Sequence, residues 1–445
     1  MRHTKILYTL LAILLTGVLP SVLVAQNGRE VYLRPSYWRP YDQRGINVFE
    51  TNKVPDSIPF DGLRVRFGAG FTQQFQGLKH SNTALNNNGG SGVNRLYPLT
   101  SGFNTSQANL NFDVQLADGI RLNLVTYLSS RHHNEAWVKG GYIQFDKLPF
   151  KGKTWDKIME LATIKIGHME INYGDAHFRR SDGGQTIYNP FIENYILDAF
   201  TTEIGGEVYL QKNGLFGMVG LTNGMIKGNI DSLVKTAQDD NVKKSPALYL
   251  KGGFDKNIGE KLRIRLAGSY YHNGSSGGNT LYAGDRTGSN YFAAMEKAGT
   301  TVTAAFSTGR LNPGFSKKVD AVQLNGFLKV GGLELFGTIE QARGRTKAEI
   351  YSRKMNQLAG DVVYRLGKQE NVFVGARYNK VKGQLNGITD DITLERLAFA
   401  GGWFVTKNVL LKGEWVKQNY MGFPGADYRN GGRFKGYVIE AVVGF

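Results

Sequence analysis

The 445-residue sequence contains no cysteine. This absence excludes disulfide bonds, thiolate metal sites, cysteine catalysis and lipid attachment through a cysteine. Long apolar runs are also missing after the N-terminus. No stretch of about 18 apolar residues follows Val24, so the sequence predicts no membrane-spanning helix beyond it.

Motifs for catalysis and metal binding are scarce as well. The sequence has no HExxH pattern and no complete GxxxxGK[ST] phosphate-binding loop. The adjacent histidines His132 and His133 fall in a short connection, where solvated surface is expected in preference to metal ligation. The sequence therefore predicts no enzyme, no metal and no cofactor. A catalytic group assembled from distant loops is an alternative that these patterns leave open.

The chain is strongly basic, with a formal net charge of +17. Nucleic-acid-binding proteins gather such charge in a run or a stripe, whereas here the lysines and arginines are scattered along the sequence. Nucleic acid is therefore not a predicted partner. Loop lysines are predicted to contact anionic lipopolysaccharide instead: Lys243, Lys244, Lys317 and Lys318.

The N-terminus has the pattern of a secretory signal peptide. Basic residues at positions 2, 3 and 5 precede an apolar run from Ile6 to Val24, and Ala25 supplies a small residue at a cleavage point. We expect residues 1–25 to be removed on export, with an uncleaved membrane anchor as the alternative. Residues 26–61 are rich in Pro and aromatics, lack a clean period, and are predicted to form a periplasmic extension or a partial plug.

Strict alternation of apolar and polar residues begins after Asp61. A period of two with one apolar face is the pattern of a half-exposed β-strand. In the first such segment Arg64 and Arg66 share the polar face, and the apolar face carries Leu63, Val65, Phe67, Ala69 and Phe71. The pattern recurs in residues 109–116, 120–124, 262–266, 322–329 and 333–340.

Short and long connections alternate between these segments, as the hairpins of a membrane β-barrel do. Short turns are predicted at 117–119, 212–214, 331–332, 367–370 and 406–408, and long loops at 76–106, 168–202, 222–245, 272–320, 343–355 and 419–433. The count gives about 16 strands, an even number in the porin range. The connection 146–160 departs from this alternation, because its position predicts a short periplasmic turn but it is long.

These observations predict an all-β fold: residues 62–445 form a transmembrane antiparallel β-barrel with short periplasmic turns and long external loops, in the outer membrane of a Gram-negative bacterium. In the last segment Tyr437, Ile439 and the terminal Phe445 share one apolar face. An apolar alternation that ends on a C-terminal aromatic resembles the signal that outer-membrane assembly machinery recognises, so that machinery is a predicted partner.

The polar face of the strands is predicted to line the lumen. Its basic residues include Arg64, Arg66, Arg121, Arg263 and Arg265. Charges of one sign select ions of the opposite sign, which predicts a modest preference for anions. The alternative is that these charges pair with acids on neighbouring strands and cancel.

The third long loop, residues 168–203, mixes both charges with aromatics and a proline. The strand 164–168 before it, the charged loop and the return at 204–208 resemble the phosphate-selective porin O and P group and related Bacteroidota porins. The resemblance implies a porin, commonly trimeric, whose third loop folds into the lumen as the constriction, here with Asp175, His177, Arg179, Arg180 and Asp182. An external cap loop is the alternative.

The function that these patterns favour is an outer-membrane porin for passive diffusion of small hydrophilic, anionic or polar solutes. A barrel that conducts nothing and serves as a scaffold in a secretion, gliding or surface-protein complex is the second hypothesis. A barrel enzyme is the third. An open lumen would favour the pore, and a lumen filled by residues 26–61 or by loops would favour the scaffold.

Overall fold

The computed structural model describes residues 46–445 except 52, 54–57, 88–91, 105–106, 130–136, 151, 183–185, 229, 260 and 302. The predicted signal peptide, most of segment 26–61 and the pair His132–His133 lie outside the described residues. Within the described part of the chain, no helix is long and apolar enough to cross a membrane.

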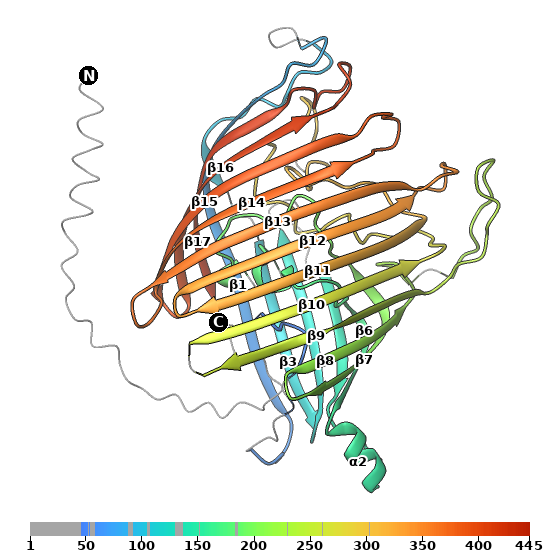
Figure 1. Ribbon diagram of the computed structural model, residues 1–445, viewed down its shortest axis with the longest axis vertical. Coiled ribbons are helices and arrows are strands. Elements are labelled where there is room, and N and C mark those ends of the chain that lie inside the picture. The colour runs from blue at the N-terminus through green and yellow to red at the C-terminus, as the bar shows by residue number, and fades with distance from the viewer. Residues whose placement is uncertain are drawn as a thin grey trace.

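The strands form one antiparallel sheet that closes on itself (Figure 1). Strands β2 and β3 both pair with β1 and together occupy one position, so the seventeen named strands make a barrel of sixteen. This confirms the predicted fold and strand number. The strands are β1 (Arg64–Ser81), β2 (Gly102–Asn104), β3 (Gln107–Ala117), β4 (Ile120–Ser129), β5 (Trp137–Phe145), β6 (Ala162–Glu170), β7 (Thr202–Lys212), β8 (Leu215–Thr222), β9 (Ala247–Ile258), β10 (Leu262–Asn273), β11 (Lys318–Val330), β12 (Leu333–Arg345), β13 (Arg353–Leu366), β14 (Val372–Gly383), β15 (Ile392–Thr406), β16 (Val409–Met421) and β17 (Arg433–Gly444).

Strands β1 and β17 close the barrel. Their register runs from Gly70 opposite Gly444 to Ser81 opposite Arg433. The terminal residue extends the seam, because the backbones of Ala69 and Phe445 exchange two hydrogen bonds of 3.0 Å. Closure gives each strand of the described sheet a neighbour on both sides, which is what a sheet in lipid requires.

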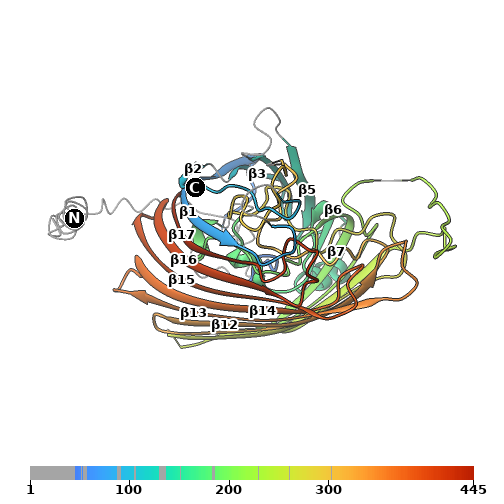
Figure 2. The ribbon, with the colours of Figure 1, turned by 90° about the horizontal axis from the view of Figure 1, so that it is seen from above.

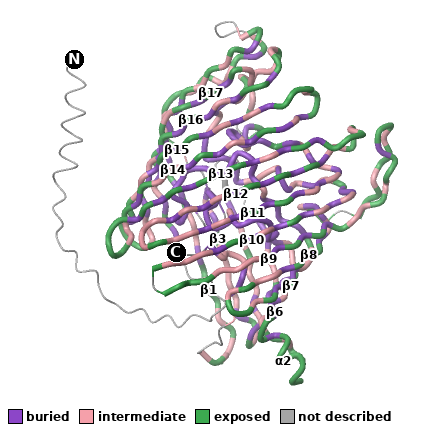
Figure 3. Tube along the Cα trace, viewed as in Figure 1, coloured by how far each residue is buried: buried purple, intermediate pink, exposed green. Residues whose placement is uncertain are grey.

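The two faces of the wall differ as the alternation predicts (Figure 3). Ile339 on β12 is 60% exposed on the outer face, whereas its neighbours Thr338 and Glu340 are 1% and 2% exposed on the inner face. In β17 the outer face carries Tyr437, Ile439 and Phe445, all more than 40% exposed. An apolar outer surface and a polar inner surface are the arrangement of a membrane barrel.

The short turns gather at one end of the barrel and the long loops at the other, as predicted. Residues 213–214 form a two-residue hairpin in which Asn213 and Gly214 both have positive φ, 53° and 82°. A hairpin with two such residues matches the right-handed twist of its strands, and Asn-Gly adopts it with little strain.

The boundaries differ from expectation at three places. The long connection 146–160 contains a helix, α2 (Lys153–Met159), that the sequence reasoning did not predict. A turn near Gly259 between β9 and β10 was not predicted either. Strand β1 continues to Ser81, although a loop was expected from residue 76. The second half of β1 carries inward-facing glutamines such as Gln74, which is 1% exposed. The alternation of apolar and polar residues that marks a strand is therefore weak there.

Removing Phe445 is expected to impair closure, because deletion loses the two hydrogen bonds to Ala69 together with an aromatic ring on the outer face. We expect less heat-modifiable barrel in the outer membrane, seen as a smaller difference between unboiled and boiled samples in SDS gels. Phe445→Tyr keeps both the ring and the backbone and serves as the control. Equal amounts of folded barrel from the deletion and the control would contradict this role of the terminus.

Candidate functional site: the charged interior

Three segments pack against the inner face of the wall. They are named here the N-terminal segment (residues 46–53, of which 46–51 and 53 are described), loop L3 (residues 171–201) and loop L5 (residues 274–317). In Figure 2, seen from above, green and gold loop traces lie within the ring of strands. Nearly every described residue of L3 is buried.

Inward-facing side chains of the strands satisfy the backbone of L3. A buried loop without a regular ladder needs such partners, because unpaired backbone groups are costly away from water. Each partner below comes from the inner face of a strand. The bonds run from Asn172 N to Glu207 (3.0 Å), Gly174 N to Ser269 (3.0 Å), Asp175 N to Asn325 (3.0 Å), Ile192 N to Glu414 (2.9 Å), Ile196 N to Asn379 (2.6 Å) and Leu197 N to Gln357 (3.0 Å).

Asp175 lies where L3, the N-terminal segment and the wall meet. Its carboxylate accepts hydrogen bonds of 2.8 and 2.7 Å from Arg265 and lies 2.7 Å from Lys251 Nζ. Glu50 joins the same cluster, 3.2 Å from Arg265. Burial alone would raise the pKa of each carboxyl, but the charges of Lys251 and Arg265 outweigh it: the pKa of Asp175 lies below its usual range, and that of Glu50 falls to about 2.

Arg179 belongs to a second cluster, which joins L3 to β12–β14. Its guanidinium lies 2.6 Å from Glu334 and 3.1 Å from Asp361. The wall supplies three more cations: Arg365 and Lys329 lie 2.8 and 3.2 Å from Glu334, and Arg377 lies 2.7 Å from Asp361. Three arginines therefore share two carboxylates, all of them buried.

Arg180 points to different partners and forms a third cluster. It pairs with Asp182 at 2.8 Å and with Asp198 at 2.6 Å, both within L3. Arg310 from L5 reaches the same group, 3.2 Å from Asp198 and 2.7 Å from Glu193. This cluster links the two loops to each other.

His177 sits at the edge of L3 next to the N-terminal segment. Its Nδ1 lies 2.6 Å from Glu170 and its Nε2 lies 2.7 Å from the carbonyl oxygen of Tyr173. The ring of Phe49 meets it edge-on, with centroids 4.7 Å apart. The structure thus distributes the five residues predicted for the constriction among three ion clusters and this contact.

Four of the five arginines predicted to line the lumen pair with a carboxylate, and the fifth, Arg66, lines a cavity. Arg64 lies apart from the rest at the turn end of β1, where its partner is well exposed. The pairs are Arg64 with Asp61 at 2.6 Å, Arg121 with Asp113 at 3.6 Å, Arg263 with Asp255 at 2.7 Å and Arg265 with Asp175 at 2.7 Å.

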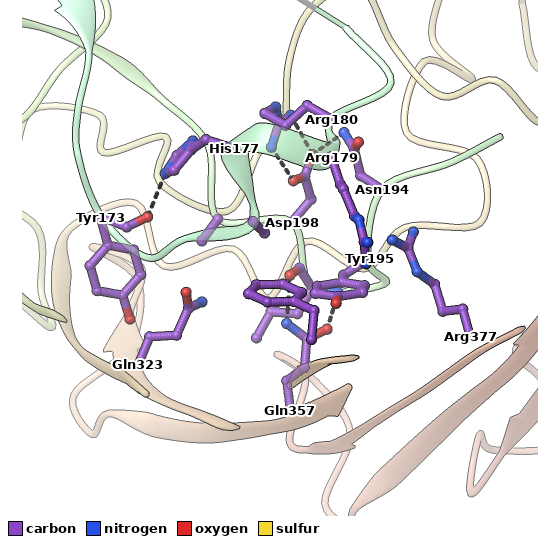
Figure 4. Close-up of a pocket in the computed structure, with 14 residues that line it drawn as sticks. Tyr173, His177, Arg179, Arg180, Asn194, Tyr195, Asp198, Gln323, Gln357 and Arg377 are labelled. Atoms are coloured by element: carbon purple, nitrogen blue, oxygen red, sulfur yellow. Dashed lines mark hydrogen bonds and ion pairs between the residues drawn. The ribbon is translucent and has the colours of Figure 1, made fainter. Parts of the chain in front are cut away.

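A small cavity of about 20 Å³ lies between L3 and strands β11–β14 (Figure 4). The arginines that border it are already held by the carboxylates described above, and the aromatic ring of Tyr195 packs against Arg377 at 4.6 Å. Its lining includes Tyr173, His177, Arg179, Arg180, Asn194, Tyr195, Asp198, Gln323, Gln357 and Arg377.

A second cavity of about 180 Å³ lies on the other side of the interior, beside β1 and β3–β7. Val48 and Phe49 of the N-terminal segment form part of its wall. The remainder mixes apolar and polar residues and carries both charges. Its basic residues are Arg66, Arg121, Lys139 and Lys165, and its acidic residues are Asp113, Glu170 and Glu207. We refer to it as the wall cavity.

One stretch has the spacing of a hydrolase nucleophile turn, Gly274–Gly278 with Ser276 at its centre. In such hydrolases the serine lies on a sharp turn between a strand and a helix, and a histidine activates it. Here Ser276 donates a hydrogen bond of 3.1 Å to the carbonyl oxygen of Gly224, and β10 is followed by loop L5. Among the described residues, no three His, Asp or Glu side chains are grouped to hold a metal ion.

The sequence reasoning missed several members of these clusters. Asp361 and Arg365 face inward by the alternation of β13, so a period of two in residues 353–366 could have identified them. Glu50, Asp198 and Arg310 lie in irregular segments, and no local pattern marks them.

A closed sixteen-stranded barrel with an apolar outer face and a charged interior defines the class of protein: a transmembrane β-barrel of the bacterial outer membrane. No protein-family model and no curated protein sequence matches the chain.

Solved structures with the same fold are porins and channels. The chain is similar to an anion-selective porin from Comamonas acidovorans, at 10% identity over 86% of this chain and 100% of that one, with a TM-score of 0.52. It also matches the outer membrane channel DcaP of Acinetobacter baumannii, at 12% identity over 86% and 98%, with a TM-score of 0.48. OmpT of Vibrio cholerae matches at 11% identity over 87% and 99%, with a TM-score of 0.47. At these identities the likeness concerns the fold alone.

Replacing Glu334 by Gln is expected to destabilise the folded barrel. The change leaves the buried guanidinium groups of Arg179 and Arg365 short of one negative charge, and breaking a buried ion pair costs about 3–5 kcal/mol. Urea unfolding of the protein in lipid vesicles measures the difference in free energy.

The matched control is Asp391→Asn, another carboxylate-to-amide change, in the exposed pair of Asp391 with Lys382. An exposed pair contributes about 1 kcal/mol or less. Equal losses in the two variants would show that the Glu334 cluster is not a structural anchor of L3.

Proposed function

We propose that the chain is a porin-like channel through which small hydrophilic solutes diffuse passively across the outer membrane, with a modest preference for anions and with no catalysis. The observation that supports this function is the wall cavity of about 180 Å³. A cavity of that volume has room for several water molecules. Its polar wall suits solutes that carry their own hydration.

The anion preference rests on the charges along this path. The wall cavity has four basic and three acidic side chains, so its lining carries a formal charge of +1. A small excess of one sign inside a low-dielectric wall attracts ions of the opposite sign. Charges of the lining are themselves paired, which keeps the preference modest: Arg121 lies 3.6 Å from Asp113, and Lys139 forms an ion pair with Asp285. Phosphate, suggested by the porin O and P resemblance, is one of the small anions that such a path would accept.

The constriction is proposed to be the side of L3 that faces the wall cavity. Met169 and Glu170, the last two residues of β6 before L3, line the cavity directly. The five residues predicted for the constriction then act mainly by fixing the loop in place through their ion pairs: Asp175, His177, Arg179, Arg180 and Asp182.

A scaffold role is the second candidate, and one observation favours it. L3 and L5 pack against the inner face of the wall from β10 to β16, and the N-terminal segment packs beside them. The interior is therefore substantially occupied on that side. Association into trimers remains a proposal in either case, as does contact of Lys243, Lys244 and Lys318 with lipopolysaccharide. The prediction was wrong for Lys317, which is buried and lies 3.4 Å from Asp239.

Purified protein in planar bilayers is expected to conduct, with a reversal potential on the anion side under a KCl gradient. Replacing Arg66 and Arg121 together by Gln changes the lining from four basic and three acidic residues to two basic and three acidic, a formal charge of −1. We expect the reversal potential to move toward the cation side.

The control removes two positive charges away from the cavity, with Lys243→Gln and Lys244→Gln in the loop between β8 and β9. It should leave the reversal potential nearly unchanged. A cation-selective wild type would contradict the proposal that the basic lining gives a preference for anions. Folded protein that forms no channels would favour the scaffold.

A further inference from the structure

Glu50 binds the barrel interior in the manner of a carboxylate ligand. It is 7% exposed, and its carboxylate lies 3.2 Å from Arg265, 3.6 Å from Lys251 and 3.2 Å from the side-chain amide nitrogen of Asn172. Two cations and an amide donor are the usual partners of a bound carboxylate. The group that fills this position belongs to the N-terminal segment and not to the wall or to L3.

The charge balance of the cluster depends on Glu50. Arg265, Lys251 and Arg263 contribute three positive charges. Asp175, Glu50 and Asp255, which lies 3.3 Å from Arg265, contribute three negative ones. Asp175 is fixed by L3 and makes two hydrogen bonds with Arg265, whereas the contacts of Glu50 with the two cations are longer. Without Glu50, the cluster would carry a buried net charge of +1, a state that strongly favours binding of an anion.

Phe49, the residue before Glu50, contacts another buried cation, Lys165. Lys165 is 3% exposed and donates a hydrogen bond of 2.6 Å to the carbonyl oxygen of Phe49. Its ammonium lies over three aromatic rings, those of Phe49, Tyr142 and Tyr209, at 4.6–5.6 Å. In the described part of the chain, Lys165 forms no ion pair with a carboxylate. Phe49 also lines the wall cavity, so the segment separates the cavity from the Glu50 position.

We propose that Arg265, Lys251 and Asn172 form a carboxylate-binding site in the barrel interior, which Glu50 of the N-terminal segment occupies as an internal ligand. A solute that bears a carboxylate competes with Glu50 for these groups. The relevance to transport rests on the proposed function, since it would make small carboxylates a preferred solute class. The site itself does not depend on conduction.

Chemical rescue tests the site in detergent-solubilised full-length protein. Glu50→Ala removes a CH₂–COO⁻ group, which has the size and charge of acetate. We expect Glu50→Ala to bind acetate at least tenfold more tightly than the wild type by isothermal titration, at constant ionic strength balanced with chloride. Acetamide, which has the same shape but no charge, should not bind.

The matched control is Glu203→Ala. Glu203 is also buried, but its carboxylate accepts from the hydroxyls of Tyr271 and Thr222 and not from cations. Its variant should gain no affinity for acetate. Equal acetate binding by Glu50→Ala and the wild type, or an equal gain in Glu203→Ala, would overturn the proposal.

If Glu50→Ala does not survive purification folded, refolding becomes the readout. Recovery of the heat-modifiable form with acetate and not with acetamide supports the site, and recovery with both or with neither contradicts it. Glu50→Gln, whose amide fills the space, should gain less affinity for acetate than Glu50→Ala. A wild type that forms no channels would end the proposed pore, while acetate binding by Glu50→Ala would still establish the site.

Discussion

Every backbone hydrogen bond in a lipid-facing sheet must be made within the protein, and the other features of the structure depend on this constraint. It requires β1 to meet β17, with the chain's last residue pairing with Ala69. Closure then gives each strand one face toward lipid and one face toward the interior. The sequence alternates for that reason, which places charged side chains such as Glu334, Arg377 and Glu414 on the inner face.

An interior of sixteen strands is wider than the wall side chains alone can fill, so it must hold water or other segments. Here both occur. L3 and L5 fill the side next to β10–β16 with backbone that strand side chains satisfy, and the wall cavity remains on the side of β1 and β3–β7. Charges in the filled part are stable only when paired, which explains why Glu334 and Asp361 are each shared between arginines.

The barrel could be predicted from the sequence because its signals are local. Alternation in residues 333–340 assigns Ile339 to the outer face and Glu340 to the inner face without knowledge of any neighbour, and a turn such as 213–214 is marked by its own residues. The ion clusters could not be predicted in this way. Arg179 and Glu334 are 155 positions apart. Glu50 meets Arg265 only because the N-terminal segment packs against L3. Such pairings depend on the three-dimensional path of irregular segments, which leaves no period in the sequence.

The most direct test of a solute path along β1 and β3–β7 uses the absence of native cysteine, which makes a single introduced thiol an unambiguous reporter. Asn123→Cys places the thiol in the wall cavity, and Asn379→Cys places it where L3 packs against β14, at a position that is 0% exposed. A negatively charged methanethiosulfonate reagent, added during current recording in a planar bilayer, modifies a thiol only if the conducting path reaches it. We expect modification at position 123 to reduce the current and treatment of the position 379 variant to leave it unchanged. A current that falls only in the position 379 variant would show that solutes take another path.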